Sequence, residues 1–484
     1  MNKTRNALVV ISLMCIFTGC QTTNAPSVYY ETWTPSPKEK TSQSEDITLA
    51  SICEQEFDAS KPFTLPELID VALRNNPSTK TAWEDARSKE ARERQTESAY
   101  YPSADVSAVV NKQKTSGSLE VNDLNVLNYT PNITAEYLLF DFGGRNARVR
   151  EAYHTLLYSN YQYNQSIQDL LLSVATRYFE LYSARSYIES TMANLLDTKT
   201  ALNAAVQKFN VGLVTKLDVL QAQSSFNKAI YSFEDAKGKL KTAEANIAYS
   251  LGLSADTKVD IIEPRKDVSR EVVKTINKKK VNEIIEESLK KRPDIAAGIA
   301  SLHAREAAVT SANSDLWPTL NVQGSAQKDW YDYYNSISNK EDTQYNAYLS
   351  VNWDIFDGFS NINKKREAEA LRDKEKEKLK QLVLSASADV WTKYYNFRTS
   401  VQKLIASKAY LNSSKTSYEL ALQGYDAGLK DILDLLNAQS ELSNARANLI
   451  ESKKDLYVAL ISLAHATGTL NTQQVSEELK KVTK

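Results

Sequence analysis

The side chains that could carry acid–base or metal chemistry are few and widely spaced. The histidines His154, His303 and His465 fall in long helical stretches, with no HExxH motif and no neighbouring cysteine. Asp354 and Asp357 end an alternating segment, where turn formation accounts for them. No GxxxxGK[ST] phosphate loop or GxSxG nucleophile motif occurs. The sequence therefore predicts a protein that is not an enzyme and holds no metal or cofactor.

The N-terminus predicts export from the cytoplasm. Residues 1–19 have a charged start, an apolar core and a small-residue exit, as in a signal peptide. The ending Thr-Gly-Cys20 resembles a bacterial lipobox, which implies that Cys20 is lipidated; ordinary cleavage nearby is the alternative. By the same resemblance, Gln21 implies sorting to the outer membrane.

The other cysteines add no redox or metal motif. Cys15 leaves with the signal, so the mature chain keeps Cys20 and Cys53. A disulfide between them is the alternative to lipidation, which would leave Cys53 alone. Residues 20–62 are rich in Ser, Thr, Pro and charge, and we expect a flexible tether.

The chain contains one unit written twice at a constant offset of 216 residues. Phe209–Gln223 aligns with Tyr425–Gln439, and Gly252 aligns with Gly468. A fixed offset of this kind is the signature of a structural repeat. We assign residues 63–252 and 281–468 to the two repeats, residues 253–280 to a linker and residues 469–484 to a polar tail.

Long antiparallel helices dominate each predicted repeat. Residues 145–209 and 360–423 lack proline and keep a helical pattern, so each would span on the order of 95 Å. Each ends at a glycine turn and is followed by a returning helix. A coiled-coil seam is expected along the first long helix. Its members are Ile167, Leu170, Val174, Tyr178, Leu181, Ile188, Met192, Leu195, Leu202, Val206 and Phe209.

Two segments in each repeat alternate between apolar and polar residues. Residues 320–327 and 345–355 do so clearly, and residues 104–108 and a segment ending at Leu139 do so in the first repeat. Each half therefore predicts two strands with one apolar face, followed by aromatic residues such as Phe140 and Phe356. Four strands cannot close a membrane barrel alone, so the barrel would be shared between chains. The number of strands per chain does not determine whether two, three or four chains form the barrel.

The order of these motifs resembles the TolC family of outer-membrane channels. The resemblance rests on the helix ends at Tyr101-Pro102 and Trp317-Pro318, the strand exit Phe356-Asp-Gly358 and the Gly-Leu tips, and it covers residues 63 to about 475. It implies a mainly α fold with β strands: a homotrimer with a shared transmembrane β-barrel in outer-membrane lipid and an α-barrel through the periplasm. It also implies a periplasmic adaptor (membrane fusion) protein and an inner-membrane ABC or proton-driven transporter as partners. The net charge of −1 gives no electrostatic case for nucleic acid.

The resemblance also implies roles for residues near the two glycine turns. The positions matching the family's periplasmic gate are Asp218, Tyr425, Lys430 and Asp434. Ion pairs and hydrogen bonds between such residues are stable in one arrangement of the helices and are broken in another. Solvated coiled-coil charges are the alternative. Tyr425 and Lys430 correspond to Phe209 and Val214 in the first repeat. We therefore expect the second hairpin to carry the lock, that is, the contacts that keep the gate closed.

The turns themselves are predicted to contact the adaptor. The residues are Gly212, Leu213, Gly428 and Leu429. An exposed Leu beside a turn glycine can enter a partner's coiled-coil groove, whereas local packing of the Leu is the alternative.

Three functions fit this architecture. The favoured one is the outer-membrane duct of type I protein secretion, which the tail after Gly468 supports. The second is the outlet of a multidrug or metal efflux pump, which lipidation of Cys20 would support. The third is a periplasmic coiled-coil scaffold without a pore, which accounts for the helices but not for the alternating strands.

Overall fold

The computed structural model describes residues 61–115, 124–263, 280–333 and 340–470. The predicted signal peptide, Cys20, Cys53 and almost all of the tether lie outside these residues. Most of the C-terminal tail does too.

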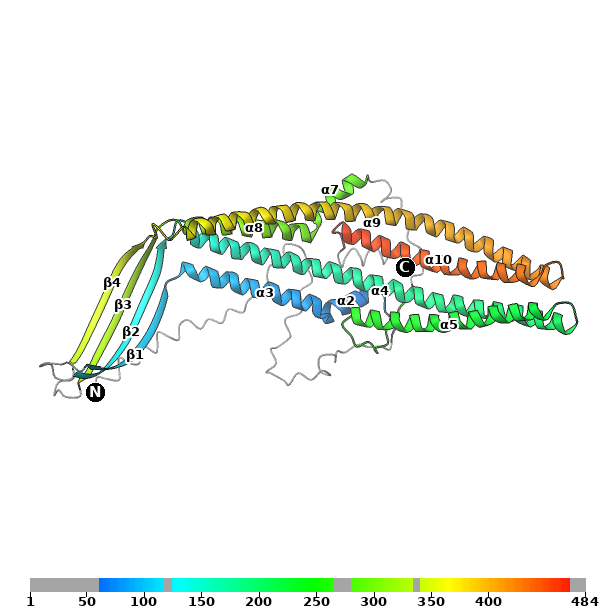
Figure 1. Ribbon diagram of the computed structural model, residues 1–484, viewed down its shortest axis with the longest axis horizontal. Coiled ribbons are helices and arrows are strands. Elements are labelled where there is room, and N and C mark those ends of the chain that lie inside the picture. Colours follow the sequence, from blue (N-terminus) through cyan, green and yellow to red (C-terminus); the bar gives the residue numbers. More distant parts are fainter. Residues whose placement is uncertain (1–60, 116–123, 264–279, 334–339, 471–484) are drawn as a thin grey trace. The chain divides into compact units, whose positions relative to one another are not determined.

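The two repeats contain the same elements in the same order (Figure 1). The first contains α2 (Leu65–Asn75), α3 (Pro77–Glu97), the 3₁₀ turn η1 (Ser98–Tyr100), β1 (Ser103–Thr115), β2 (Leu124–Phe140), α4 (Gly144–Asn210) and α5 (Lys216–Ser250). The second contains α7 (Val281–Lys291), α8 (Pro293–Ser314), β3 (Thr319–Tyr333), β4 (Lys340–Asn352), α9 (Ser360–Asp426) and α10 (Ile432–Ala466). Helices α4 and α9 have 67 residues each, and α5 and α10 have 35 each. The predicted duplicated, mainly helical fold with four strands is confirmed.

Local sequence sets the helix ends. Thr64 and Glu67 form a capping box at the start of α2, where the Thr64 amide donates to Glu67 Oε2 at 2.7 Å. Asn76 and Arg292 precede prolines and take extended backbone angles, which ends α2 and α7.

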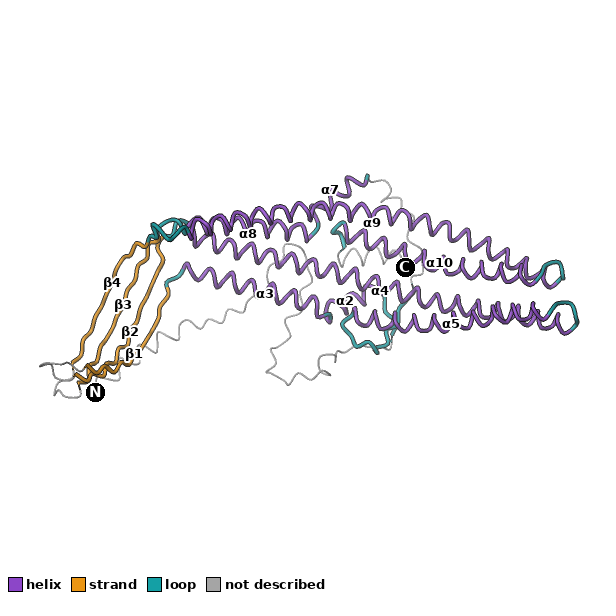
Figure 2. The backbone as a smooth tube through the Cα atoms, viewed as in Figure 1, coloured by secondary structure: helices purple, strands orange, loops and turns teal. Residues whose placement is uncertain are grey.

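Helix α4 is the element against which most of the other helices pack. It contacts α2, α3, α5, α8 and α10, and Figure 2 shows these helices running alongside one another. The rings of Phe179 on α4 and Tyr457 on α10 stack with centroids 4.5 Å apart. Among the described residues, no helix combines the length and the apolar character needed to cross a membrane.

The predicted seam of α4 is correct only in its first half. Ile167 and Leu181 are buried with the seam residues between them, but Met192, Val206 and Phe209 are substantially exposed. Small residues on a neighbouring face of the helix lie against the partner helices instead. They are Thr191, Thr198, Ala201 and Ala205. Small side chains let the helices approach closely, so the contact shifts onto them and the larger apolar residues turn outward.

The four strands form one antiparallel sheet in the order β1-β2-β3-β4. The register places like residues in rows across the sheet. One row runs from Val106 through Ile133 and Ala326 to Tyr345, and the neighbouring row on the opposite face begins with Asp105. The sheet therefore has one apolar and one polar face, as the alternation predicts.

Two details of the sheet depart from the sequence prediction. Strand β4 ends at Asn352, three residues earlier than expected, because its partner β3 begins opposite at Thr319. Pairing between β2 and β3 also skips Thr130 and Pro131, where proline lacks the amide that the ladder needs. A hydrogen bond from Thr130 Oγ1 to Asp329 Oδ1 at 2.6 Å joins the strands there.

Candidate functional site: the paired helical tips

Two helical hairpins end in equivalent turns. We call α4 with α5 the first hairpin and α9 with α10 the second. Gly212 and Gly428 adopt φ of +77° and +76°, a left-handed conformation that favours glycine. In both turns the following leucine amide donates to the carbonyl five residues back, at 2.9 and 2.8 Å.

The predicted adaptor-contacting leucines project outward. Leu213 is 73% exposed and Leu429 is 82% exposed. A Cβ atom added at Gly212 or Gly428 would meet no atom within 4 Å. The two leucines are therefore largely exposed in the single chain, and their contact with an adaptor stays a prediction.

Asp218 caps the helix that follows the first turn. Its Oδ2 accepts hydrogen bonds from the Thr215 amide at 2.7 Å and from Thr215 Oγ1 at 2.8 Å. These bonds form a capping box at the start of α5. The carboxylate is therefore fixed in position at the start of α5.

Lys430 and Asp434 pair within the second hairpin. Lys430 Nζ lies 3.1 Å from Asp434 Oδ2, and both side chains are about half exposed. The Lys430 side chain lies against Gly424, where a Cβ would be only 2.8 Å from Lys430 Cγ. Asp431, rather than Asp434, caps α10 by accepting from the Asp434 amide at 2.8 Å.

Tyr425 is buried between the hairpins. Its hydroxyl has no hydrogen-bond partner among the described residues. Burial and then the carboxylates of Asp218 and Asp426 raise the pKa of this hydroxyl above its ordinary value. Tyr425 and Asp218 are thus close enough to interact, although no direct hydrogen bond joins them.

The sequence prediction missed Lys208, near the end of α4. Its Nζ donates to the carbonyl oxygen of Tyr425, lies 3.4 Å from that of Asp426 and sits 4.5 Å from the centre of the Tyr425 ring. It is the charged residue that links the two hairpins at their tips. Its position in the repeat corresponds to Gly424, so the alignment of the repeats gave no signal for it.

An apolar cluster supports these polar groups. It joins small residues of the first hairpin to large residues of the second. Its buried members are Ala201, Ala205, Ala222, Tyr418, Tyr425, Ile432, Leu435 and Leu442. The side-chain amide of Gln439 and the Oε1 atom of Gln221 are buried nearby without hydrogen-bond partners among the described residues.

Two of the histidines lie together and the third lies apart. The rings of His154 and His303 are tilted against each other with centroids 5.3 Å apart, and His465 Nε2 lies 2.7 Å from Asp169 Oδ1, which links α10 to α4. In the part of the chain that the structure describes, no three His, Cys, Asp or Glu side chains are arranged to hold a metal ion.

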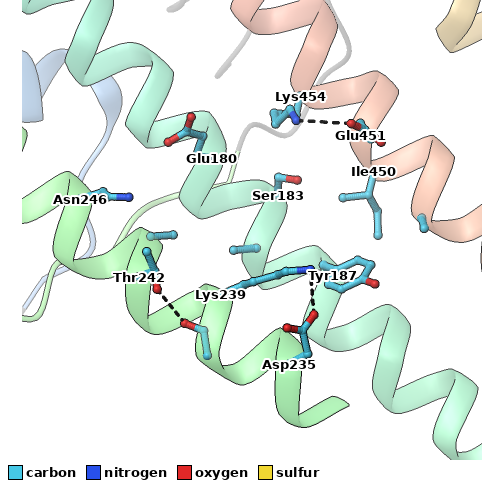
Figure 3. Close-up of a pocket in the computed structure, with 14 residues that line it drawn as sticks. Glu180, Ser183, Tyr187, Asp235, Lys239, Thr242, Asn246, Ile450, Glu451 and Lys454 are labelled. Carbon is cyan, nitrogen blue, oxygen red and sulfur yellow. Dashed lines mark hydrogen bonds and ion pairs between the residues drawn. The ribbon is translucent and has the colours of Figure 1, made fainter. Parts of the chain in front are cut away.

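A groove of about 750 Å³ lies between α4, α5 and α10, farther from the tips than the apolar cluster (Figure 3). Most of the charged side chains along it pair with one another, and Glu180 pairs with Arg177 on the same helix. Lys239 lies 2.8 Å from Asp235, and Lys454 lies 3.9 Å from Glu451.

Both repeats match the sequence profile of the family described as outer membrane efflux protein, over residues 68–253 and 284–469. Protein CyaE from Bordetella pertussis is 26% identical over 433 residues, 89% of this chain and 89% of that protein. The alkaline protease secretion protein AprF from Pseudomonas aeruginosa is 22% identical over 343 residues, 71% of this chain and 70% of that protein. The solved CmeC outer membrane channel of Campylobacter jejuni is 17% identical and superposes with a TM-score of 0.71, over 92% of this chain and 98% of that one.

Proposed function

The chain belongs to the outer membrane efflux protein family, and from that premise we propose that it forms, as a homotrimer, the outer-membrane channel of an export machine. It is an outer-membrane protein of a Gram-negative bacterium. We also propose that it has a pore, a defined number of subunits, partner proteins and an exported cargo, as argued below.

The apolar face of the sheet is the observation that carries the proposal. Val106, Tyr345 and Leu349 are 72%, 80% and 62% exposed, and no part of the described chain covers them. The strands have 13 to 17 residues, enough to cross about 30 Å of hydrocarbon at a tilt. A lipid-facing sheet leaves such a face exposed in the isolated chain.

The junction of strands and helices supports a membrane interface at one end of the sheet. Phe142 and Phe359 take φ of +51° and +67°, a left-handed conformation that costs a non-glycine residue about 1 kcal/mol. Both rings are exposed, and Phe142 stacks on Trp317 with centroids 5.3 Å apart. Exposed aromatic residues held at the ends of strands suit the boundary between lipid and water.

The open sheet edges support a shared barrel. Among the described residues, strands β1 and β4 each have a single partner, and unpaired strand edges are not tolerated in lipid. Closed membrane barrels have at least about eight strands. We infer that three chains, each contributing four strands, close the barrel, while α4 and α9, each about 100 Å long, extend it across the periplasm.

We assign the periplasmic gate to Asp218, Tyr425, Lys430 and Asp434, and the adaptor contact to Leu213 and Leu429. In support, Tyr425 and Gln439 are buried at the contact between the hairpins, and their hydroxyl and amide groups have no hydrogen-bond partner among the described residues. Separation of the tips would let these polar groups reach water. The partners would be a periplasmic adaptor and an inner-membrane transporter.

For the cargo we propose a polypeptide, as in type I secretion. The similarity to a protease secretion protein supports this choice. The family's description as efflux proteins favours the second candidate, a pump outlet for small molecules. Deleting the gene separates them: loss of an exported protein from the medium supports secretion, whereas drug or metal sensitivity with normal protein export supports efflux.

Single-channel recording of the purified protein in planar bilayers tests the pore and the gate together. Wild type should give small conductance steps, and Tyr425→Phe combined with Lys430→Ser should give clearly larger ones. A wild type that forms no channels and stays out of outer-membrane fractions would contradict the pore. Channels of unchanged conductance in the double variant would contradict the gate assignment alone.

A further inference from the structure

Lys208 connects the end of the first hairpin to the end of the second. It lies in the last turn of α4, and its Nζ reaches the carbonyl oxygens of Tyr425 and Asp426 in the last turn of α9. The same Nζ lies 4.5 Å from the centre of the Tyr425 ring. One half-buried cation therefore makes three contacts across the hairpins.

Each contact is one that a cation satisfies well. The last carbonyls of a helix lack intrahelical partners and lie at the negative end of the helix dipole. A hydrogen bond from an ammonium group is stronger than a neutral one, and the aromatic face adds a cation–π attraction. Partial burial also protects the contacts from screening by salt.

In this link the first hairpin supplies the donor and the second hairpin supplies the acceptors. The position equivalent to Lys208 in the second hairpin is Gly424, and the stem of Lys430 occupies the space that a side chain there would need. The second hairpin therefore has no lysine to return the contact. Higher on α4, Asp197 and Asp169 pair with Arg446 and His465 of α10, at 2.8 and 2.7 Å.

We propose that Lys208 is a latch that holds the first hairpin against the second at the tip and keeps the periplasmic end closed. This inference rests on the proposed channel function. It adds the first hairpin to the expectation that the second hairpin carries the lock, because for this contact the second hairpin supplies the acceptors and the first supplies the donor. The Arg446 and His465 pairs keep the upper parts of the hairpins together when the latch opens, so the movement is confined to the tips.

The test compares Lys208→Met with Lys216→Met in the full-length protein. Lys208→Met keeps the length of the side chain but removes its charge and donors. Lys216 lies on the same tip, but its Nζ is 5.5 Å from the centre of the Phe209 ring, within its own hairpin. In single-channel records, Lys208→Met should raise the ratio of open to closed time by about tenfold, the change expected when one charge-assisted hydrogen bond is lost. Lys216→Met should match wild type, and Lys208→Arg should restore most of the closed time.

A second measurement guards against a folding defect. Oligomeric state by size exclusion and thermal unfolding by circular dichroism should be close to wild type in Lys208→Met. If all variants form channels and Lys208→Met gates like wild type or like Lys216→Met, the latch is overturned while the pore stands. If Lys208→Met loses the oligomer, Lys208 is an assembly residue and the latch is also overturned. A wild type without channels overturns the proposed function itself.

Discussion

Arg292 donates a hydrogen bond to the carbonyl oxygen of Ala466 at 3.0 Å, joining the end of α7 to the end of α10. Asn76 makes the equivalent bond to Ser250 at 2.9 Å in the first repeat, 216 residues earlier. In both places a residue before a proline meets the last turn of a hairpin. The repeats thus share the joint that positions each hairpin, although the two donors differ in type.

Gly468 is essential to this joint. It has φ of +66°, and a Cβ there would lie 2.9 Å from backbone atoms of Lys291. We expect Gly468→Ala to lower the free energy of unfolding by about 2 kcal/mol or more, because left-handed backbone strain adds to a clash with rigid backbone. Thermal unfolding followed by circular dichroism measures the effect.

Gly238 gives the matched control for that substitution. It lies in the interior of α5, and an added Cβ would meet no atom within 4 Å. Gly238→Ala should therefore raise the free energy of unfolding by about 0.5–1 kcal/mol. Equal effects of the two substitutions would show that the close approach at Gly468 is not a constraint.

Arg446 and Asp197 form a partly buried ion pair between the hairpins. Their atoms are 2.8 Å apart, and each side chain is about one-quarter exposed. Arg446→Met should cost about 1–3 kcal/mol, since it leaves the Asp197 carboxylate without its partner. Adding Asp197→Asn should recover part of the loss, and a double-mutant cycle of thermal unfolding measures the coupling. Additive costs would mean that the pair contributes no coupling energy.

Features set by neighbouring residues in the chain could be predicted from the sequence, whereas features set by distant residues could not. The capping box at Thr64, the turn at Gly428 and the repeat offset depend on short motifs. The prediction for the lower seam of α4 was wrong because the helices pack through the small Thr198 and Ala205. The larger Val206 is left exposed. Lys208 was missed because its acceptors are backbone carbonyls 217 and 218 residues away, which carry no side-chain signal in the sequence.

His154 should make the protein sensitive to acid. Burial, and then the nearby His303 and Arg150, lower the pKa of His154 below its ordinary value, against a smaller opposing effect of Glu306. A depressed pKa in the folded state means that stability is complete above about pH 6.5 and is lost as the pH falls through the folded pKa. Thermal unfolding between about pH 7 and pH 5 should show this loss, and His154→Gln should reduce it. An identical pH dependence in the variant would remove His154 as the cause.

Gly424 should control the gate through Lys430, which rests on the proposed role of Lys430. A Cβ at residue 424 would lie 2.8 Å from Lys430 Cγ and 3.4 Å from Lys430 Cβ, so Gly424→Ala must push the lysine stem away from α9. The pair that Lys430 forms with Asp434 is about half exposed, and its loss alone would cost less than about 1 kcal/mol in stability. Alanine also favours the helix over glycine by a similar amount.

The thermal midpoint of Gly424→Ala should therefore stay near that of wild type, while single-channel records show more open time. The control is Lys430→Ser, alone and combined with Gly424→Ala. Because serine has no stem to displace, Gly424→Ala should add nothing to the open time in that background. If Gly424→Ala adds the same open time with and without Lys430, glycine acts on the tip by another route, such as the flexibility of the last turn of α9.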